Sequence, residues 1–293
     1  MKVSFIACFF FIFSYTALST AAKVRITPDG SEAEIEEFPY QVLITLQGNP
    51  LCGGSLISDL HVLTAAHCVY KIVADPYGDI GDVKILVGSK YLGGGQSHNV
   101  RRISHHKDYI DETIDTPYFI PNDVAVIQLE SRVTLSPQVQ PISLPSGEID
   151  TSTPVVVTGY GSTVYAGQPS MVLRKLYTYT ISLDECRAQH PKIILDSSIC
   201  TDRFKYDELY QTYGGTCSGD SGGPLVDINK KMIIGVVSGG YGGCDSPYAN
   251  VFARVSHFLP YIYSETSYYT LHPYEASEHP SITNIFYRYA NEK

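Results

Sequence analysis

The sequence predicts an all-β fold of barrels or sandwiches. Short runs of β-branched and aromatic residues recur along the chain, separated by turn residues. Several runs alternate apolar with polar residues, which is the period of a half-buried strand. Helical periodicity is scarce before Val255–Tyr263, where we expect a C-terminal helix. Strand-rich chains of this kind form closed barrels or stacked sheets.

Seven segments carry the strand pattern most clearly. The expected strands are Tyr40–Leu46, Val83–Val87, Val124–Leu129, Val155–Thr158, Lys175–Ile181, Met232–Ser238 and Asn250–Val255. Alternation is unbroken in Leu176–Ile181 (LYTYTI), so that strand should bury one face only. Ala74–Gly81 and Tyr91–Gln96 contain clustered turn residues and are expected to be loops.

The two ends of the chain differ from the middle. Residues 1–22 have a basic start, an almost wholly apolar stretch at Val3–Tyr15 and small residues at Thr16–Ala22, the pattern of a secretory signal. The apolar stretch is shorter than the ~20 residues that a membrane helix needs, so we expect a secreted, extracellular protein without a membrane anchor. Beyond Ser264 the composition shifts to Tyr, Ser, Glu, His and Pro, which predicts an appended tail at 265–293 of unknown role.

Cysteine usage agrees with export. Cys8 lies in the signal, which leaves an even set suited to disulfides in an oxidising compartment: Cys52, Cys68, Cys186, Cys200, Cys217 and Cys244. Spacing alone leaves every pairing open. The absence of a Cys-x-x-Cys pair argues against zinc, and the formal charge of −9 argues against a nucleic-acid partner.

Gly219–Pro224 (GDSGGP) is the strongest sign of chemistry. A serine flanked by glycines can occupy a tight turn with its hydroxyl exposed, because glycine tolerates the backbone angles required. Unhindered N–H groups of such a turn point to where a substrate oxyanion would form. Ser221 is therefore the candidate nucleophile. The same motif fits the G-x-S-x-G elbow of α/β-hydrolases, so it leaves two enzyme classes open.

Two further motifs supply the partners of a nucleophilic serine. His67 lies in Thr64–Cys68 (TAAHC), and Asp123 precedes an apolar strand in Asn122–Val126 (NDVAV). Alone, such a histidine is often a core residue and such an aspartate a turn residue. The order separates the classes, because α/β-hydrolases run serine, acid, histidine, whereas here the histidine comes first and the serine last.

With these motifs the sequence resembles the chymotrypsin/trypsin family of serine proteases. The resemblance extends from about Arg25 to about Tyr263, and it also includes Phe38–Gln41 (FPYQ), Cys52–Leu56 (CGGSL), Gly159–Gly161 (GYG) and Val237-Ser238. It implies two six-stranded antiparallel β-barrels with a catalytic triad between them, in a domain at 26–264 after a short propeptide at 23–25. It further implies the disulfides Cys52–Cys68, Cys186–Cys200 and Cys217–Cys244.

The resemblance implies the working parts of a secreted serine endopeptidase. His67 would take the proton of Ser221 as its oxygen attacks a carbonyl, while Asp123 orients the imidazole. The N–H groups of Gly219 and Ser221 would form the oxyanion hole, and Ser238 would bond Asp123. This scheme needs no metal or organic cofactor. The expected partners are protein or peptide substrates and protein protease inhibitors, and we expect a monomer.

Family members are activated by a cut that frees a new amino group, which pairs with the aspartate before the catalytic serine. Arg25-Ile26 and Asp220 supply these parts here. The segment that follows, Thr27–Gly30 (TPDG), departs from the family's usual Ile-Val-Gly-Gly start by one extra residue and a proline. The alternative is that Arg25-Ile26 is an incidental dipeptide.

The residue six before the nucleophile forms the base of the family's primary pocket. Here it is Gly215, with Thr216 beside it, so the base carries no carboxylate. Gly240 matches a glycine at the pocket entrance, and Asn250 would narrow the slot and add a polar contact. This predicts a chymotrypsin-like or elastase-like preference for apolar, medium-sized residues. The competing interpretation uses Asp245 as a displaced anchor for Lys or Arg, although a solvated rim carboxylate contributes little.

The chain has no tryptophan, and Gly239 stands where a ring usually walls the family's substrate cleft. Its loss removes apolar contact area, which predicts a looser grip on the substrate and looser subsite selection. The alternative function is a catalytically silent homologue that acts as a binding or regulatory module. Silent homologues typically lose a triad member, whereas this chain retains all three residues.

Overall fold

The computed structural model describes residues 31–111, 119–163, 166–202, 206–207, 212–213, 215–239, 244 and 246–267, with 206–207 and 212–213 as backbone only. The predicted signal at 1–22, the propeptide at 23–25 and the tail from 268 onward lie outside the described residues.

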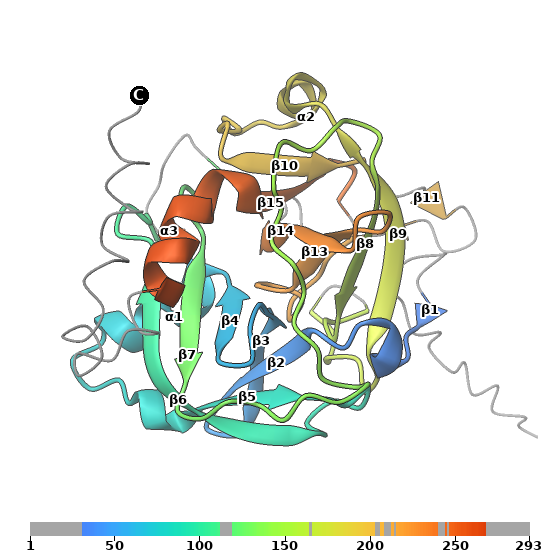
Figure 1. Cartoon of the computed structure of the whole chain (residues 1–293). Helices are drawn as coiled ribbons and strands as arrows, with labels where there is room; N and C mark the ends of the chain where they lie inside the picture. The colour runs from blue at the N-terminus through green and yellow to red at the C-terminus, as the bar shows by residue number, and fades with distance from the viewer. Residues whose placement is uncertain are drawn as a thin grey trace, which may run out of the picture.

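The first half of the domain is a closed antiparallel barrel. Its strands follow the order β2 (Gln41–Leu46), β3 (Asn49–Leu56), β4 (His61–Thr64), β7 (Ala125–Leu129), β6 (Gln96–His105) and β5 (Val83–Val87), and β5 pairs back onto β2. Figure 1 shows these strands in blue to green. Inward side chains such as Val42, Ile85 and Ile127 are fully buried, so the barrel interior is packed with branched apolar residues.

The second half is a second barrel of the same type. The order is β8 (Pro154–Gly159), β9 (Arg174–Ile181), β10 (Ser198–Thr201), β15 (Asn250–Arg254), β14 (Met232–Gly239) and β13 (Pro224–Asp227). Because β13 pairs with β8, these six strands also close. β1 (Ser31–Glu32) adds to the edge of β9, and β11 (Tyr206–Asp207) pairs with β12 (Thr212–Tyr213) separately. The predicted fold of two six-stranded antiparallel barrels is confirmed.

Three α-helices and two 3-10 turns, η1 (Ile35–Glu37) and η2 (Ile80–Asp82), lie among the described residues. α1 (Ala66–Ala74) and α2 (Leu183–Gln189) are short, and each contains a half-cystine. α3 (Val255–Ser267) is the predicted C-terminal helix, and it extends past Tyr263. An ion pair between Arg102 and Glu265 holds its last turn against β6. Within these described stretches, no helix has the length and apolar character to cross a membrane.

The two barrels share one seam. Thr158 Oγ1 on β8 donates to Gln41 Oε1 on β2 over 2.6 Å in a buried hydrogen bond. One apolar cluster includes Val42 and Leu63 of the first barrel together with Val226 and Ile233 of the second. Because the apolar cluster and this hydrogen bond both cross the seam, the loops of the two barrels are held in a fixed position relative to each other there.

Candidate active site

His67 is the second residue of α1 and projects from the end of the first barrel. Ala65 and Ala66 are fully buried, and their small side chains allow the start of this helix to pack closely against the first barrel. The Cys52–Cys68 disulfide ties the same turn of helix to β3. The His67 side chain is 14% exposed, so its imidazole is held at the surface of the seam rather than inside either barrel.

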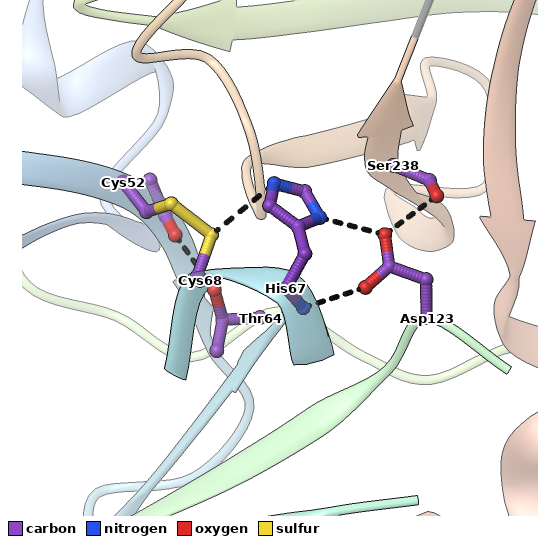
Figure 2. The surroundings of a disulfide bond; sticks show 7 residues. Cys52, Thr64, His67, Cys68, Asp123 and Ser238 are labelled. Atoms are coloured by element: carbon purple, nitrogen blue, oxygen red, sulfur yellow. Dashed lines mark hydrogen bonds and ion pairs between the residues drawn. A yellow bond between two sulfur atoms is a disulfide. The ribbon is translucent and has the colours of Figure 1, made fainter. Parts of the chain in front are cut away.

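Asp123 lies just before β7 and is only 1% exposed. Its carboxylate accepts three hydrogen bonds, from the His67 backbone N–H (2.9 Å), from His67 Nδ1 (2.8 Å) and from Ser238 Oγ (2.6 Å), as Figure 2 shows. Asn122 has a φ of 56°, a left-handed turn that suits asparagine, and its side chain donates to the Asp108 carbonyl. The turn therefore fixes the direction of the carboxylate.

This arrangement selects one tautomer of the neutral imidazole. With Nδ1–H donating to Asp123, Nε2 carries the lone pair and can accept a proton. Nε2 lies 3.7 Å from Cys68 Sγ, so the disulfide borders the Nε2 edge of the ring. The ring nitrogen and the sulfurs of Cys52 and Cys68 are spaced closely enough for a metal. However, the two sulfurs are bonded to each other and provide no thiolate ligand.

Ser221 occupies a turn that needs glycine on both sides. Gly219 and Gly222 have φ values of 97° and 77°, which side chains rarely adopt. A Cβ at Gly222 would lie 2.2 Å from Thr64 Oγ1, so the turn packs against the end of β4, three residues before His67. The carbonyl of Ser221 accepts from the Gly53 N–H over 2.8 Å. The turn that bears Ser221 is thus fixed to the barrel that bears His67.

The N–H groups of Gly219 and Ser221 are the predicted oxyanion donors. Neighbouring groups of the turn are used internally, since Gly222 donates to the Val237 carbonyl and Gly223 to that of Asp220. Among the residues that the structure describes, neither the Gly219 nor the Ser221 N–H has an acceptor. Two adjacent donors of this kind can stabilise a negatively charged oxygen.

Asp220 points away from the turn and into the second barrel, where it is 1% exposed. Its carboxylate accepts from the N–H groups of Gly161 (2.8 Å) and Cys217 (3.0 Å). A Cβ at Gly159 or Gly161 would overlap the Asp220 carboxylate, so these glycines make room for it. Burial raises the Asp220 pKa to about 6, against the lowering effect of the two hydrogen bonds. The predicted partner Ile26, like Arg25, lies outside the described residues.

The predicted pocket residues are placed in part. Asn250 opens β15 and is 7% exposed, and its Oδ1 accepts from the Thr216 N–H (3.3 Å) and the Thr216 hydroxyl (3.2 Å). Gly215 is half-buried next to Thr216. The amide of Asn250 is therefore held against the predicted pocket base, whereas Gly240 and Asp245 lie outside the described residues.

Two residues beside this site were not predicted from the sequence. Phe119 and Ile120, four and three residues before Asp123, lie over Gly239. The available signal was an apolar pair just before the NDVAV motif, in a chain that lacks the expected ring at Gly239. The six predicted half-cystines are joined as Cys52–Cys68, Cys186–Cys200 and Cys217–Cys244, the pairs that the resemblance implies.

Comparisons with known proteins agree with this picture. The family model described as Trypsin matches residues 27–262. A trypsin of Phaedon cochleariae is 32% identical over 87% of this chain and 96% of its own, and a brachyurin of Leptuca pugilator is 34% identical over 81% and 97%. Among solved structures, HL collagenase (32% identical, TM-score 0.68) covers 82% of this chain and 98% of its own. Human heparin binding protein (26%, TM-score 0.65) covers 80% and 95%.

Proposed function

The chain belongs to the trypsin family and is a serine endopeptidase, and from this premise we propose that Ser221 is its nucleophile, with His67 as base and Asp123 as the group that orients the base. The observation that carries the proposal is the partly buried hydrogen bond from His67 Nδ1 to Asp123 at 2.8 Å. This hydrogen bond leaves Nε2 as the proton acceptor, and the reaction requires this tautomer of the imidazole.

The reaction proceeds through an acyl-enzyme. Ser221 Oγ attacks the substrate carbonyl while His67 Nε2 takes its proton, and the N–H groups of Gly219 and Ser221 bind the oxyanion. His67 then donates the proton to the leaving amine, and water hydrolyses the ester by the same steps in reverse. The Asp123 carboxylate offsets the imidazolium charge, and the Ser238 hydroxyl donates to this carboxylate over 2.6 Å.

We assign the primary pocket an apolar preference. Gly215 contributes no side chain to the base of the pocket, and the amide oxygen of Asn250 accepts two hydrogen bonds from Thr216. This part of the pocket therefore presents no carboxylate to a cationic side chain. A pocket of this kind favours apolar residues of medium size, such as Leu or Met, at P1, the residue on the acyl side of the cleaved bond. Asp245 as an anchor for Lys or Arg is the opposing outcome.

Secretion and activation complete the proposal. Three disulfides among the described cysteines suit an oxidising compartment, and the predicted signal at 1–22 supplies the route there. A cut after Arg25 would free the Ile26 amino group to pair with buried Asp220. This pairing would fix the neighbouring oxyanion donors in place.

A scan of chromogenic peptides that differ only at P1 tests the function and the specificity together. Protein cut after Arg25 should hydrolyse peptides with Leu, Met or Phe at P1 faster than those with Arg or Lys. Ser221→Ala serves as the blank and should lose activity by roughly 10⁶-fold. Hydrolysis that survives in Ser221→Ala would refute the nucleophile, and a preference for Arg or Lys would refute the apolar pocket.

A further inference from the structure

The turn that follows β6 supports the Asp123 segment through two hydrogen bonds. The His106 N–H donates to the Val124 carbonyl over 3.0 Å, and the Asn122 side chain donates to the Asp108 carbonyl over 2.8 Å. The residues held by these bonds are the two neighbours of Asp123 in the chain. The direction of the Asp123 carboxylate therefore depends on the shape of this turn.

The imidazole of His106 holds the turn in shape. Its Nδ1 accepts a hydrogen bond from the Asp108 N–H over 3.2 Å, and only the lone pair of a neutral ring can accept it. A proton on Nδ1 would replace this acceptor with a donor that faces another donor. The hydrogen bond across the turn can therefore exist only while His106 is neutral.

The same ring is in contact with α3. Its centroid lies 5.6 Å from that of the Phe258 ring and 5.1 Å from that of the Tyr261 ring, at interplanar angles of 68° and 62°. Phe258 is buried, and the Tyr261 hydroxyl donates to the Ser104 carbonyl over 2.7 Å. One half-buried histidine therefore lies between the C-terminal helix and the turn that supports Asp123.

The same segment also contacts the helix that bears His67. Tyr70 lies in α1, three residues after His67, and its ring meets the rings of His105 and Tyr109 at centroid distances of 5.1 Å and 5.2 Å. Residues 105–109 thus touch both elements that carry the His67–Asp123 pair. A change in their conformation would reach both members of the pair.

The surroundings of His106 disfavour a charged ring. Burial lowers the pKa of His106. The Asp108 carboxylate opposes this effect, but it is exposed and pairs with Lys107. Positive charge on Lys107, His257 and His105 lowers the pKa further. Among the described residues, the ionisable groups that face His106 from its own segment and from α3 are His105, Lys107, Asp108, His257 and Tyr261.

We propose that His106 is a positioning residue that works only when neutral: it holds the Asp123 turn against α3, and its protonation loosens both. Acid breaks the hydrogen bond from the Asp108 N–H and places a charged ring beside His257, which becomes charged in the same pH range. The structural part of the proposal stands on the fold alone. Its effect on catalysis rests on the proposed function.

His106→Asn tests the titration. An asparagine side chain can accept the N–H two residues further on, as in an Asx-turn, but it does not titrate. As pH falls from about 8 to about 5.5, wild type should lose stability relative to this variant in denaturant melts, because the unfolded chain takes up the proton at a higher pH than the folded one. Melts of the two proteins that change in parallel with pH would overturn the titration.

His98→Asn is the matched control. Burial also lowers the pKa of His98, which lies on the same strand but pairs with Ile85 of β5, away from the Asp123 turn. This variant should alter the melts in the same direction, without the effects on exchange and kinetics described next. If His106→Asn does not fold, His257→Gln takes its place. It removes an exposed charge beside His106 and should reduce the loss of stability in acid.

Hydrogen exchange and kinetics test the positioning. Once corrected for intrinsic rates, the amides of α3 and of residues 122–126 should exchange faster at about pH 5.5 than at about pH 8 in wild type, but not in His106→Asn. The ratio of kcat for His106→Asn to kcat for wild type should rise severalfold over this range, since protonation of His67 affects both proteins and cancels.

Exchange of these amides that is the same at both pH values would overturn the positioning, and a constant kcat ratio would overturn its effect on catalysis. A complete lack of peptidase activity at about pH 8, where histidines are neutral, would contradict the proposed function instead. The melts and the exchange would still decide the structural part.

Discussion

Asp123 holds a carboxylate that is 1% exposed and yet receives three hydrogen bonds. A buried charge is costly unless donors satisfy it, and here two donors belong to His67 and one to Ser238. The same hydrogen bonds that offset the free-energy cost of burying the carboxylate also fix the orientation of the imidazole. In the proposed mechanism, stability and catalysis therefore depend on one set of contacts at this residue.

Replacing Asp123 with Asn should separate the two roles. The amide keeps the shape of the carboxylate but can turn its NH₂ toward His67, which then holds its proton on Nε2 and cannot act as a base. We expect kcat to fall by roughly 10⁴-fold with KM little changed. Steady-state kinetics on a Leu-P1 peptide measures this. Equal kcat in wild type and variant would show that Asp123 does not orient the base.

At the scale of elements, periodicity predicted the strands that bury regular alternating or continuous apolar faces. All seven expected strands are present within a residue or so of their predicted limits, β5 among them. β3 was not predicted, because Gly53, Gly54 and Pro50 are turn residues by composition, although tertiary pairing holds them in a strand. β6 is largely polar, and β13 is too short to show a period.

The same limits apply to the helices and the site. α1 and α2 are too short for helical periodicity to register, and disulfides from Cys68 and Cys186 hold them in place. Motifs identified the triad candidates, since each candidate lies within its own short stretch of recognisable sequence. Contacts such as Ile120 against Gly239 join segments far apart in the chain, so no local pattern could indicate them.

Two disulfides of similar span allow a matched test at this scale. Cys52–Cys68 and Cys186–Cys200 have sequence separations of 16 and 14, so replacing either pair with Ala should lower the free energy of unfolding by roughly 3 kcal/mol. Only the first pair adjoins the reactive edge of His67, so its loss should also lower kcat. Denaturant melts and kinetics on both double variants check this. Equal kcat values would show that Cys52–Cys68 is purely structural.

For the whole molecule, the seam between the barrels is where proposed activation acts. Asp220 is buried in the second barrel beside this seam, and burial raises its pKa to about 6, above the ~3.9 of an unfolded aspartate. A carboxylic acid whose pKa is higher in the folded state than in the unfolded state loses its proton at a lower pH in the unfolded chain. Stability of the uncut protein therefore falls as pH rises from about 4 to about 6, and the penalty is complete above that range.

Asp220→Asn removes this titration. In uncut protein the variant should gain stability relative to wild type as pH rises from 4 to 8, by a change on the order of 3 kcal/mol. After a cut behind Arg25 the trend should reverse, because the Ile26 amino group then pairs with the wild-type carboxylate. Denaturant unfolding of both proteins, cut and uncut, measures it. A difference that does not vary with pH would contradict the buried, titrating Asp220.

The central claim is that Ser221 is an activated nucleophile. The most direct measurement treats protein cut after Arg25 with a fluorophosphonate and maps the adduct by peptide mass spectrometry. We expect one adduct per chain, on the peptide that contains Ser221, with peptide hydrolysis lost in proportion to labelling and no adduct in Ser221→Ala. Hydrolysis abolished by an adduct on a different residue, or hydrolysis that persists in fully labelled protein, would contradict the account.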